Sequence, residues 1–252
     1  MFEPLAAWLP RCEADVLCLQ EVTRTAGLTG WTRFEDGERS LPQRANLFRD
    51  IATLLPHHQG VFVASDAGPV WDEDGVRRVQ DFGLAMFVRE RLPIVGQHSA
   101  FVHGDFVVHE EWAIADRPRI AQAARIVDHS ADRTITVAHL HGLRDPAGKA
   151  DSPARQAQAQ RLSDVIAATR GATDFVVACG DFNILPTSET FGILGRAGLV
   201  DLVGTTDTRT SRYDKPVRHA NYMLVSEPEA VRSFEAPPSP EVSDHRFLVL
   251  DI

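Results

Sequence analysis

Short apolar runs that lead directly into polar residues recur along the chain. The runs at 16–19, 175–179 and 247–252 are rich in Val, Leu, Phe and Cys, a composition typical of buried strands. Similar segments bounded by turn-forming residues predict further strands at 60–64, 83–89, 114–128, 134–140, 222–225 and 231–234. We therefore expect many short strands from one end of the chain to the other.

Helical spacing of apolar residues appears between these runs and predicts helices over 2–11, 46–55, 154–169 and 188–197. Ser152 or Asp151 should cap the third helix, with Pro153 at its first position. Strands and helices mixed in this way favour an α/β fold. The 252 residues contain no internal repeat, so we expect a single domain over 1–252.

Three of the apolar runs adjoin side chains suited to chemistry. These are Glu21 after the first run, Asp181 and Asn183 after the second, and Asp244 and His245 before the last. Strand ends in α/β scaffolds usually carry the functional groups, so we expect the five residues to meet. Carboxylate and amide oxygens are ligands for Mg²⁺ or Mn²⁺, and an imidazole beside them is a suitable base.

The segments Gln20-Glu21, Gly180-Asp181-Phe182-Asn183 and Ser243-Asp244-His245, in this order, resemble the endonuclease/exonuclease/phosphatase superfamily, which includes deoxyribonuclease I. The resemblance covers nearly the whole chain. It implies a four-layer α/β sandwich, in which two packed mixed β-sheets are flanked by helices. It also implies a divalent-metal-dependent phosphoesterase that uses a metal- and His-activated water for in-line attack on phosphorus.

The resemblance assigns roles to the motif residues. Glu21 would ligate Mg²⁺ or Mn²⁺ directly, and Asp181 and Asp244 are further candidate metal ligands. Asp181 would also activate or steady the attacking water, and His245 would serve as the general base. Asn183 lies two positions after Asp181, so on an extended backbone both side chains would project to the same side, where Asn183 would bind the phosphate or orient the nucleophile. The alternative for this pair is an Asx turn that caps the following loop.

A further histidine is implied at the end of the strand that finishes in His139-Leu140-His141. Either His139 or His141 could contact the scissile phosphate or protonate the leaving group. We favour His141 because it is nearer the following loop, with His139 a close second. Arg144 and Lys149 in that loop are predicted to contact substrate phosphate.

Two features depart from the pattern of the superfamily. Most relatives have an Asp where this chain has Asn221, and that Asp accepts a hydrogen bond from the catalytic histidine. An amide can still orient the imidazole, but it lacks the charge that stabilises an imidazolium, so we expect weakened activity. Relatives also begin with a strand that carries an active-site Asn, roughly twenty residues before the Gln-Glu pair. Here Met1 falls within the helix that should follow, so we expect either a sequence truncated at its start or a fold that lacks the usual first strand.

Composition bears on the choice of substrate. The formal charge of −9 disfavours a broad basic surface of the kind that tracks nucleic-acid backbones. A nuclease would need a local basic patch, and the candidates for it are Arg77, Arg78, Arg117, Arg119, Arg125, Arg144, Lys149 and Arg155. Nuclease action is our first expectation and a small-molecule or lipid phosphoester the second. The alternative is a weakened or inactive member that binds a phosphorylated ligand or a partner protein.

Cysteine spacing and hydropathy bear on location. Cys12, Cys18 and Cys179 form no Cys-x-x-Cys pair, and two of them lie inside apolar runs, so reduced core thiols are expected. No stretch reaches the roughly 18 apolar residues of a membrane span, and the first residues lack a secretory pattern. We therefore expect a cytoplasmic protein without a membrane span. The oligomeric state is left open.

Overall fold

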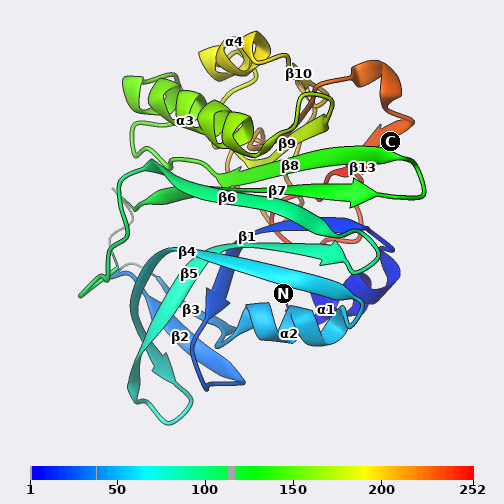
Figure 1. The fold of residues 1–252 in the computed structure, drawn as a ribbon. Helices are drawn as coiled ribbons and strands as arrows, with labels where there is room; N and C mark the ends of the chain where they lie inside the picture. The colour runs from blue at the N-terminus through cyan, green and yellow to red at the C-terminus, as the bar shows by residue number, and fades with distance from the viewer. Residues whose placement is uncertain (1, 38, 113–116) are drawn as a thin grey trace.

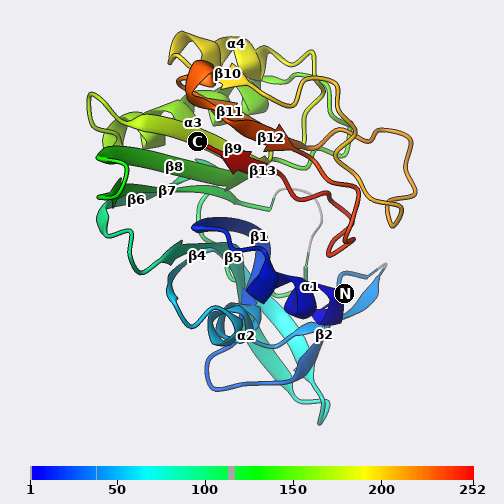
Figure 2. The same cartoon turned by 90° about the vertical axis from the view of Figure 1, so that its right-hand side faces the viewer.

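The computed structural model describes residues 2–37, 39–112 and 117–252. Two β-sheets pack against each other, and helices cover the outer face of each sheet (Figure 1). The same four layers are visible from the side in Figure 2. The four-layer α/β sandwich expected from the sequence is confirmed.

The first sheet has five strands in the order β1-β5-β4-β2-β3, and every neighbouring pair is antiparallel. Its strands are β1 (Val16–Arg24), β2 (Trp31–Glu35), β3 (Ser40–Arg44), β4 (His58–Asp72) and β5 (Arg77–Arg89). Its outer face is covered by the helix α1 (Phe2–Trp8), the short 3-10 helix η1 (Leu9–Arg11) and the helix α2 (Leu47–Leu54). Among the described strands, β1 is the edge strand of this sheet.

The second sheet has six strands in the order β10-β11-β9-β8-β7-β6, and only β8 and β9 run parallel. Its strands are β6 (Ile94–His103), β7 (Arg119–Asp128), β8 (Arg133–His141), β9 (Phe175–Asp181), β10 (Val200–Asp201) and β11 (Asn221–Val225). The outer helices are α3 (Pro153–Thr169) and α4 (Glu189–Arg196). A 3-10 turn η2 (Pro228–Ala230) and the small sheet of β12 (Ser233–Glu235) with β13 (Val249–Asp251) complete the chain.

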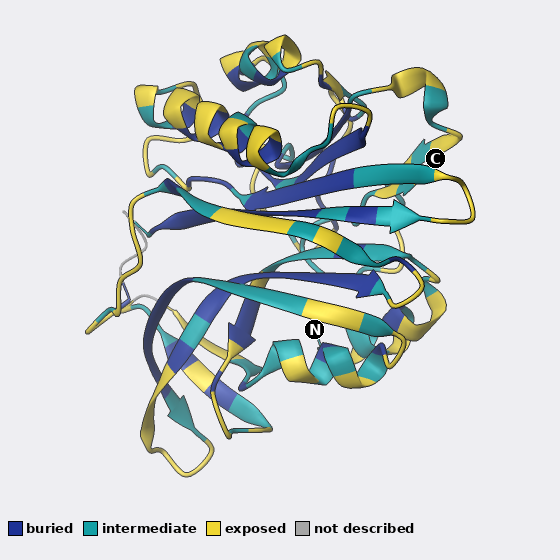
Figure 3. Ribbon diagram, in the orientation of Figure 1, coloured by how far each residue is buried: buried dark blue, intermediate teal, exposed yellow. Residues whose placement is uncertain are grey.

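The main hydrophobic core fills the space between the sheets and continues under α3. It joins Met86 of the first sheet to Ala121 and Val177 of the second, and it includes Leu162 and Ile166 of α3. Figure 3 shows the central strands largely buried and the outward side of α3 exposed. Burial of this apolar surface is the main force that holds the layers together.

The helices lie close to their expected positions because their caps are encoded locally. Ser152 accepts a hydrogen bond from the backbone N–H of Arg155, and Pro153 occupies the first turn of α3 as expected. Asn46 and Ser188 cap α2 and α4 in the same way. The first helix is shorter than expected, because the chain tightens into η1 at Leu9–Arg11, where a proline follows Leu9.

Several strands differ from the sequence expectation. β4 and β5 form a hairpin much longer than 60–64 and 83–89, and β2, β3, β6 and β10 were not expected. β12 begins two residues later than 231, and β13 covers only the middle of 247–252. The strand expected over 114–128 is observed from Arg119, and its first residues fall partly outside the described ranges.

The state of the cysteines and the hydropathy of the helices can be compared with the expectations from the sequence. All three cysteines are free, and Cys179 is buried. Across the residues that the structure describes, no helix combines the length and apolar character needed to cross a bilayer.

Candidate active site

Strand register brings three of the predicted residues to one level of the second sheet. Parallel pairing of β8 with β9 places His141 beside Asp181, and antiparallel pairing of β11 with β9 places Asn221 on the other side of Asp181. The next backbone segments also approach closely at Gly142, where a Cβ atom would lie 2.3 Å from the carbonyl oxygen of Phe182. Only glycine fits there, so this residue allows the strand ends to converge.

Asp181 and Asn183 are held by a local turn. The Oδ1 atom of Asp181 accepts a hydrogen bond from the backbone N–H of Asn183 at 2.8 Å, and Asn183 has a φ of +55°. The extended backbone expected at this point is therefore wrong, because the chain leaves β9 in an Asx turn. The side chain of Asn183 donates to the carbonyl oxygen of Gly142 at 3.3 Å, which ties the turn to the end of β8.

Asn221 fixes the orientation of the His245 ring. Its amide nitrogen donates to the carbonyl oxygen of Arg246 at 3.0 Å, so its Oδ1 atom faces the ring and accepts from Nδ1 of His245 at 2.5 Å. Nδ1 must then carry the proton, which leaves the lone pair on Nε2. That Nε2 atom lies 3.6 Å from Oδ2 of Asp181. The imidazole is therefore oriented as a base beside a buried carboxylate.

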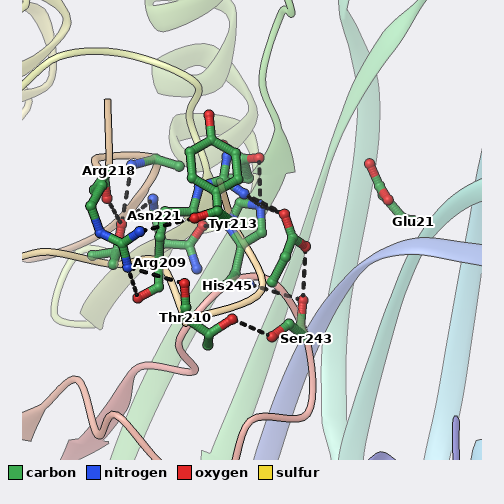
Figure 4. Close-up of polar contacts among 12 residues, drawn as sticks. Glu21, Arg209, Thr210, Tyr213, Arg218, Asn221, Ser243 and His245 are labelled. Carbon is green, nitrogen blue, oxygen red and sulfur yellow. Dashed lines mark hydrogen bonds and ion pairs between the residues drawn. The ribbon is translucent and has the colours of Figure 1, made fainter. Parts of the chain in front are cut away.

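Arg209 is a member of this cluster that the sequence did not indicate. Its Nη1 atom donates to Oδ2 of Asp244 at 2.8 Å and also contacts Nε2 of His245 (Figure 4). Its guanidinium carbon lies 4.0 Å from the ring centroid of Tyr213, and the residue is almost fully buried. The carboxylate of Asp244 is thus engaged with Arg209. Arg209 lies in a loop without a motif, and only the fold brings it to the Ser243-Asp244-His245 segment.

Glu21 enters the site from the other sheet. It lies at an irregularity of β1 between Leu19 and Val22 and has a φ of +57°, unusual for a residue with a side chain. Its side chain is 68% exposed, and its Oε1 atom lies 3.8 Å from Nε2 of His141. The same nitrogen is 4.0 Å from Oδ2 of Asp181. Figure 4 shows Glu21 across from the cluster around His245.

The structure separates the two candidate histidines. His139 is fully buried, with Nδ1 facing Gln20 at 3.3 Å and Nε2 facing Gln122 at 2.9 Å. Burial lowers the pKa of His139 to about 3, so it is a neutral core residue without contact to the cluster. His141, by contrast, faces Glu21 and Asp181. Its pKa is also well below the usual value, first because of burial and then because of the neighbouring Arg119.

The charge of Asp181 is supported by its neighbours. Burial alone would raise the pKa of this carboxyl group, but His245, His141 and Arg209 together hold the pKa below its usual range. Asp181 is therefore ionised at neutral pH. An ionised, buried carboxylate next to two imidazoles can order a water molecule and accept or relay its proton.

The two predicted phosphate-binding cations lie near this cluster. Arg144 is exposed and lines a pocket with Glu21 and His141. Lys149 donates to the carbonyl oxygen of His219. Burial lowers the pKa of Lys149 to about 8, whereas the charge of Asp181 favours its cationic form. Lys149 therefore adds positive charge close to Asp181.

The other arginines considered for a basic patch are dispersed or neutralised. Arg125 forms a two-pronged pair with Asp174, and Arg78 pairs with Asp72. Arg155 is buried and donates to backbone carbonyl groups. Arg117 and Arg119 do lie together with Arg144, in the lining of one pocket.

The donor set suits a hard divalent cation that keeps much of its own coordination shell. In the ranges 2–37, 39–112 and 117–252, no three His, Cys, Asp or Glu side chains are grouped to enclose a metal. Mg²⁺ typically takes one or two carboxylates and completes its shell with water and substrate phosphate. Glu21, with its exposed carboxylate, meets that requirement, and Asp181 lies on the other side of His141.

Comparison with known proteins finds relatives of this chain by sequence and by fold. The chain is 32% identical over 214 residues to an inositol phosphosphingolipids phospholipase C of Schizosaccharomyces pombe, a match that covers 84% of this chain and 42% of that protein. The chain thus spans less than half the length of this relative. Among solved structures, a mannosyl-6-phosphatase of Bacteroides thetaiotaomicron has a TM-score of 0.64 at 17% identity, covering 98% of this chain and 90% of that one.

The human Nocturnin catalytic domain shares the fold, with a TM-score of 0.63 at 22% identity and coverage of 99% and 84% of the two chains. The sequence profile of the Endonuclease/Exonuclease/phosphatase family matches residues 2–245. That match includes Glu21, Asp181 and His245 together. The chain therefore belongs to the endonuclease/exonuclease/phosphatase family.

Proposed function

We infer that this protein is a divalent-metal-dependent phosphodiesterase. The observation that carries the proposal is the continuous set of contacts from Glu21 through His141 and Asp181 to His245. These groups come from both sheets and lie next to one another, as hydrolysis of a phosphoester requires. Family membership supports a hydrolase that acts on phosphoesters.

In the proposed reaction, the Nε2 atom of His245 exchanges its hydrogen bond from Arg209 for one from a water molecule ordered by Asp181, and its lone pair then accepts a proton from that water. The water oxygen forms a bond to phosphorus, and the ester bond on the opposite side breaks. The leaving alkoxide oxygen takes a proton from solvent and departs as an alcohol, and His245 returns its proton to solvent. Neutral His141 donates a hydrogen bond to a phosphoryl oxygen, and Asn221 keeps the His245 ring in its tautomer.

The proposal includes Mg²⁺ or Mn²⁺, held by Glu21 with Asp181 in support. When bound, the ion would neutralise phosphoryl oxygen charge and increase the acidity of a bound water. Asp244 was also a predicted ligand. In the structure its carboxylate binds Arg209, so we propose that it positions this guanidinium beside His245.

For the substrate, we propose a small-molecule or lipid-headgroup phosphodiester in preference to nucleic acid. The relative from Schizosaccharomyces pombe is by its name a phospholipase C, which supports a phosphodiester of this type. The net charge of −9 and the dispersed arginines do not offer the basic track that a nucleic-acid backbone needs.

Metal removal gives a direct test of the proposed function. Hydrolysis of bis(4-nitrophenyl) phosphate should fall at least about a hundredfold in EDTA and return when Mg²⁺ or Mn²⁺ is added. Glu21→Gln should require about tenfold more metal for half-maximal rate, because it replaces a charged ligand with a neutral one. Turnover that continues unchanged in EDTA would contradict the proposal.

Asn221 favours a second candidate function, that of a weakened member that mainly binds a phosphorylated ligand or a partner protein. Asn221→Asp distinguishes the two. A carboxylate facing Nδ1 would stabilise the imidazolium, and we expect kcat to rise about tenfold for that reason. The rise is limited because the second carboxylate oxygen would face the carbonyl oxygen of Arg246, which the Asn221 amide now donates to. The rate is measured on the same diester, with Asn221→Ala as the control that should lose activity. A binding protein would show no turnover in any of the three forms.

A further inference from the structure

The pocket that Arg144 lines with Glu21 and His141, here called the side pocket, lies beside the candidate active site. Glu21 and His141 line one end of it, and Phe34 and Leu41 of the β2–β3 hairpin line the other. Its cavity volume is about 120 Å³, smaller than a site for a whole drug-sized ligand, so it has room for one small organic group of a substrate. Glu21 and His141 are candidate active-site residues and also line this side pocket. A group bound in the side pocket can therefore belong to the same substrate molecule as the reacting phosphate.

The wall of the side pocket is a rigid aromatic cluster. Phe34, Phe82 and Trp112 form a buried cluster of their own, separate from the main core. The Trp112 ring centroid lies 5.2 Å from that of Phe34 and 6.4 Å from that of Phe82. The indole N–H of Trp112 donates to the carbonyl oxygen of Pro69 at 2.7 Å. These contacts give the pocket a fixed apolar surface before any ligand arrives.

Arg117 extends this wall and is already neutralised. It donates two hydrogen bonds, at 2.7 and 3.0 Å, to the fully buried carboxylate of Asp66. Its guanidinium lies over Phe82 and Trp112, 4.3 and 4.7 Å from the ring centroids. Burial alone would raise the pKa of Asp66, but the bonds from Arg117 hold it below its usual range. Arg117 is therefore part of the scaffold of the pocket.

Arg119 is different, because it is buried and forms no ion pair with a carboxylate among the described residues. It is 4% exposed, and no described residue accepts a hydrogen bond from its Nε atom. No carboxylate in the described ranges forms an ion pair with it. Burial, and then Arg117, lower the pKa of Arg119 to about 10, so it remains charged at neutral pH. The charges of Glu21, Asp66 and Asp181 offset part of the cost of burying this cation, and a bound anion in direct contact with it would offset more.

Arg144 supplies a second positive charge at the mouth of the same pocket. It is exposed and belongs to the loop that follows His141. In a chain with a formal charge of −9, Arg119 and Arg144 make this pocket locally cationic. The aromatic wall favours the apolar part of a ligand and the arginines favour an anionic part.

We propose that the side pocket binds the organic group beyond the scissile phosphorus, and that Arg119 and Arg144 select phosphoesters whose organic group carries a second anionic substituent. This proposal rests on the proposed function only in placing the reacting phosphate beside Glu21 and His141. The second anion could belong to a free phosphorylated metabolite or to a lipid headgroup, because both present the same chemistry to the pocket.

Binding of two matched phosphonates tests the proposal without turnover. Phenylphosphonate and 4-carboxyphenylphosphonate share the ring and the phosphate mimic, and differ in one carboxylate. In calorimetry with Mg²⁺, the wild-type protein should bind the carboxylated compound about tenfold more tightly, the effect of one charge-assisted contact of about 1.4 kcal/mol. Arg144→Gln should remove most of this preference, and Arg144→Glu should reverse it. Arg232→Gln, at a surface pair with Asp251, is the control that should change nothing.

Other results would overturn the assignment. Equal affinity for both phosphonates, or a preference that survives Arg144→Gln and Arg119→Gln, would exclude an anion-selective pocket. Equal weakening of both compounds in Arg119→Gln would place that guanidinium on the reacting phosphate. If the preference is found but no diester is hydrolysed, the side pocket stands and the proposed enzymatic function fails.

The source of the second anion is then tested on hydrolysis rates. Methyl phenyl phosphate and methyl 4-carboxyphenyl phosphate serve as free diesters. Vesicles of phosphatidylcholine that contain phosphatidylinositol or phosphatidylinositol 4-phosphate serve as lipid substrates. A preference of about tenfold for the more anionic member should appear in the set that contains the true substrate class. Diester hydrolysis without a preference in either set contradicts the proposed pocket while leaving the phosphodiesterase intact.

Discussion

Replacing His245 with alanine should lower kcat/KM for a phosphodiester by about a thousandfold, the size expected when a general base is removed. The reason is geometric: Asn221 holds the proton on Nδ1 and leaves the Nε2 lone pair 3.6 Å from Asp181. His141 also lies near Asp181, but among the described contacts no Asn amide oxygen faces its ring as Asn221 faces that of His245. Steady-state kinetics with saturating metal would measure the loss.

A matched control makes this result specific. His98 is an exposed histidine of β6, and His98→Ala should leave kcat/KM within about twofold of wild type. Circular dichroism and a melting curve should show that His245→Ala remains folded, because the ring is at the rim of the core. If His245→Ala keeps near wild-type turnover, the base is a different group and the proposed mechanism is wrong.

The sequence predicted the parts of the site that depend on strand ends. A buried strand followed by Glu21 or by Asp181 can be recognised locally, because apolar runs and polar ends are visible in one dimension. Helix caps such as Ser152 with Pro153 are equally local. Strand register then converts these separate signals into contacts, as in the alignment of His141, Asp181 and Asn221.

Other parts depend on tertiary contacts that carry no local signal. Arg209 reaches His245 only because its loop folds over the Ser243-Asp244-His245 segment. The choice between His139 and His141 required knowledge of how deeply each side chain is buried. Both project from one face of β8, and only their burial distinguishes them. The β2–β3 hairpin consists mainly of polar residues, so apolar periodicity could not reveal the wall that it gives to the side pocket.

The Asx turn at Asn183 shows a related limit. Residues two apart project to one side only while the backbone stays extended. The hydrogen bond from the Asn183 backbone to Asp181 turns the chain at the end of β9. This turn leaves Oδ2 of Asp181 free to face His141 and His245, and the Asn183 side chain binds the Gly142 carbonyl. The predicted role of Asn183 in phosphate binding therefore requires that amide to contact substrate as well.

Asp181→Asn should also lower kcat/KM by about a thousandfold, with little change in stability. Asparagine keeps an oxygen that can accept the hydrogen bond from the Asn183 backbone, so the turn should survive. It removes the negative charge that faces both His245 and His141, which in the proposed mechanism orders the water and stabilises a protonated His245. Kinetics on the diester, together with urea unfolding, would measure both effects.

Asp174→Asn is the matched control, because Asp174 is also a buried carboxylate but lies at the start of β9, away from the site. It accepts two hydrogen bonds from Arg125 and one from Thr136, so its loss should reduce the free energy of unfolding by roughly 3 kcal/mol. The folded fraction of Asp174→Asn should keep its kcat/KM. The two substitutions thus make the same chemical change with different consequences. Asp181→Asn lowers kcat/KM, and Asp174→Asn lowers the free energy of unfolding. Equal effects of both variants on rate would mean that Asp181 acts through folding, and the candidate site would lose its central carboxylate.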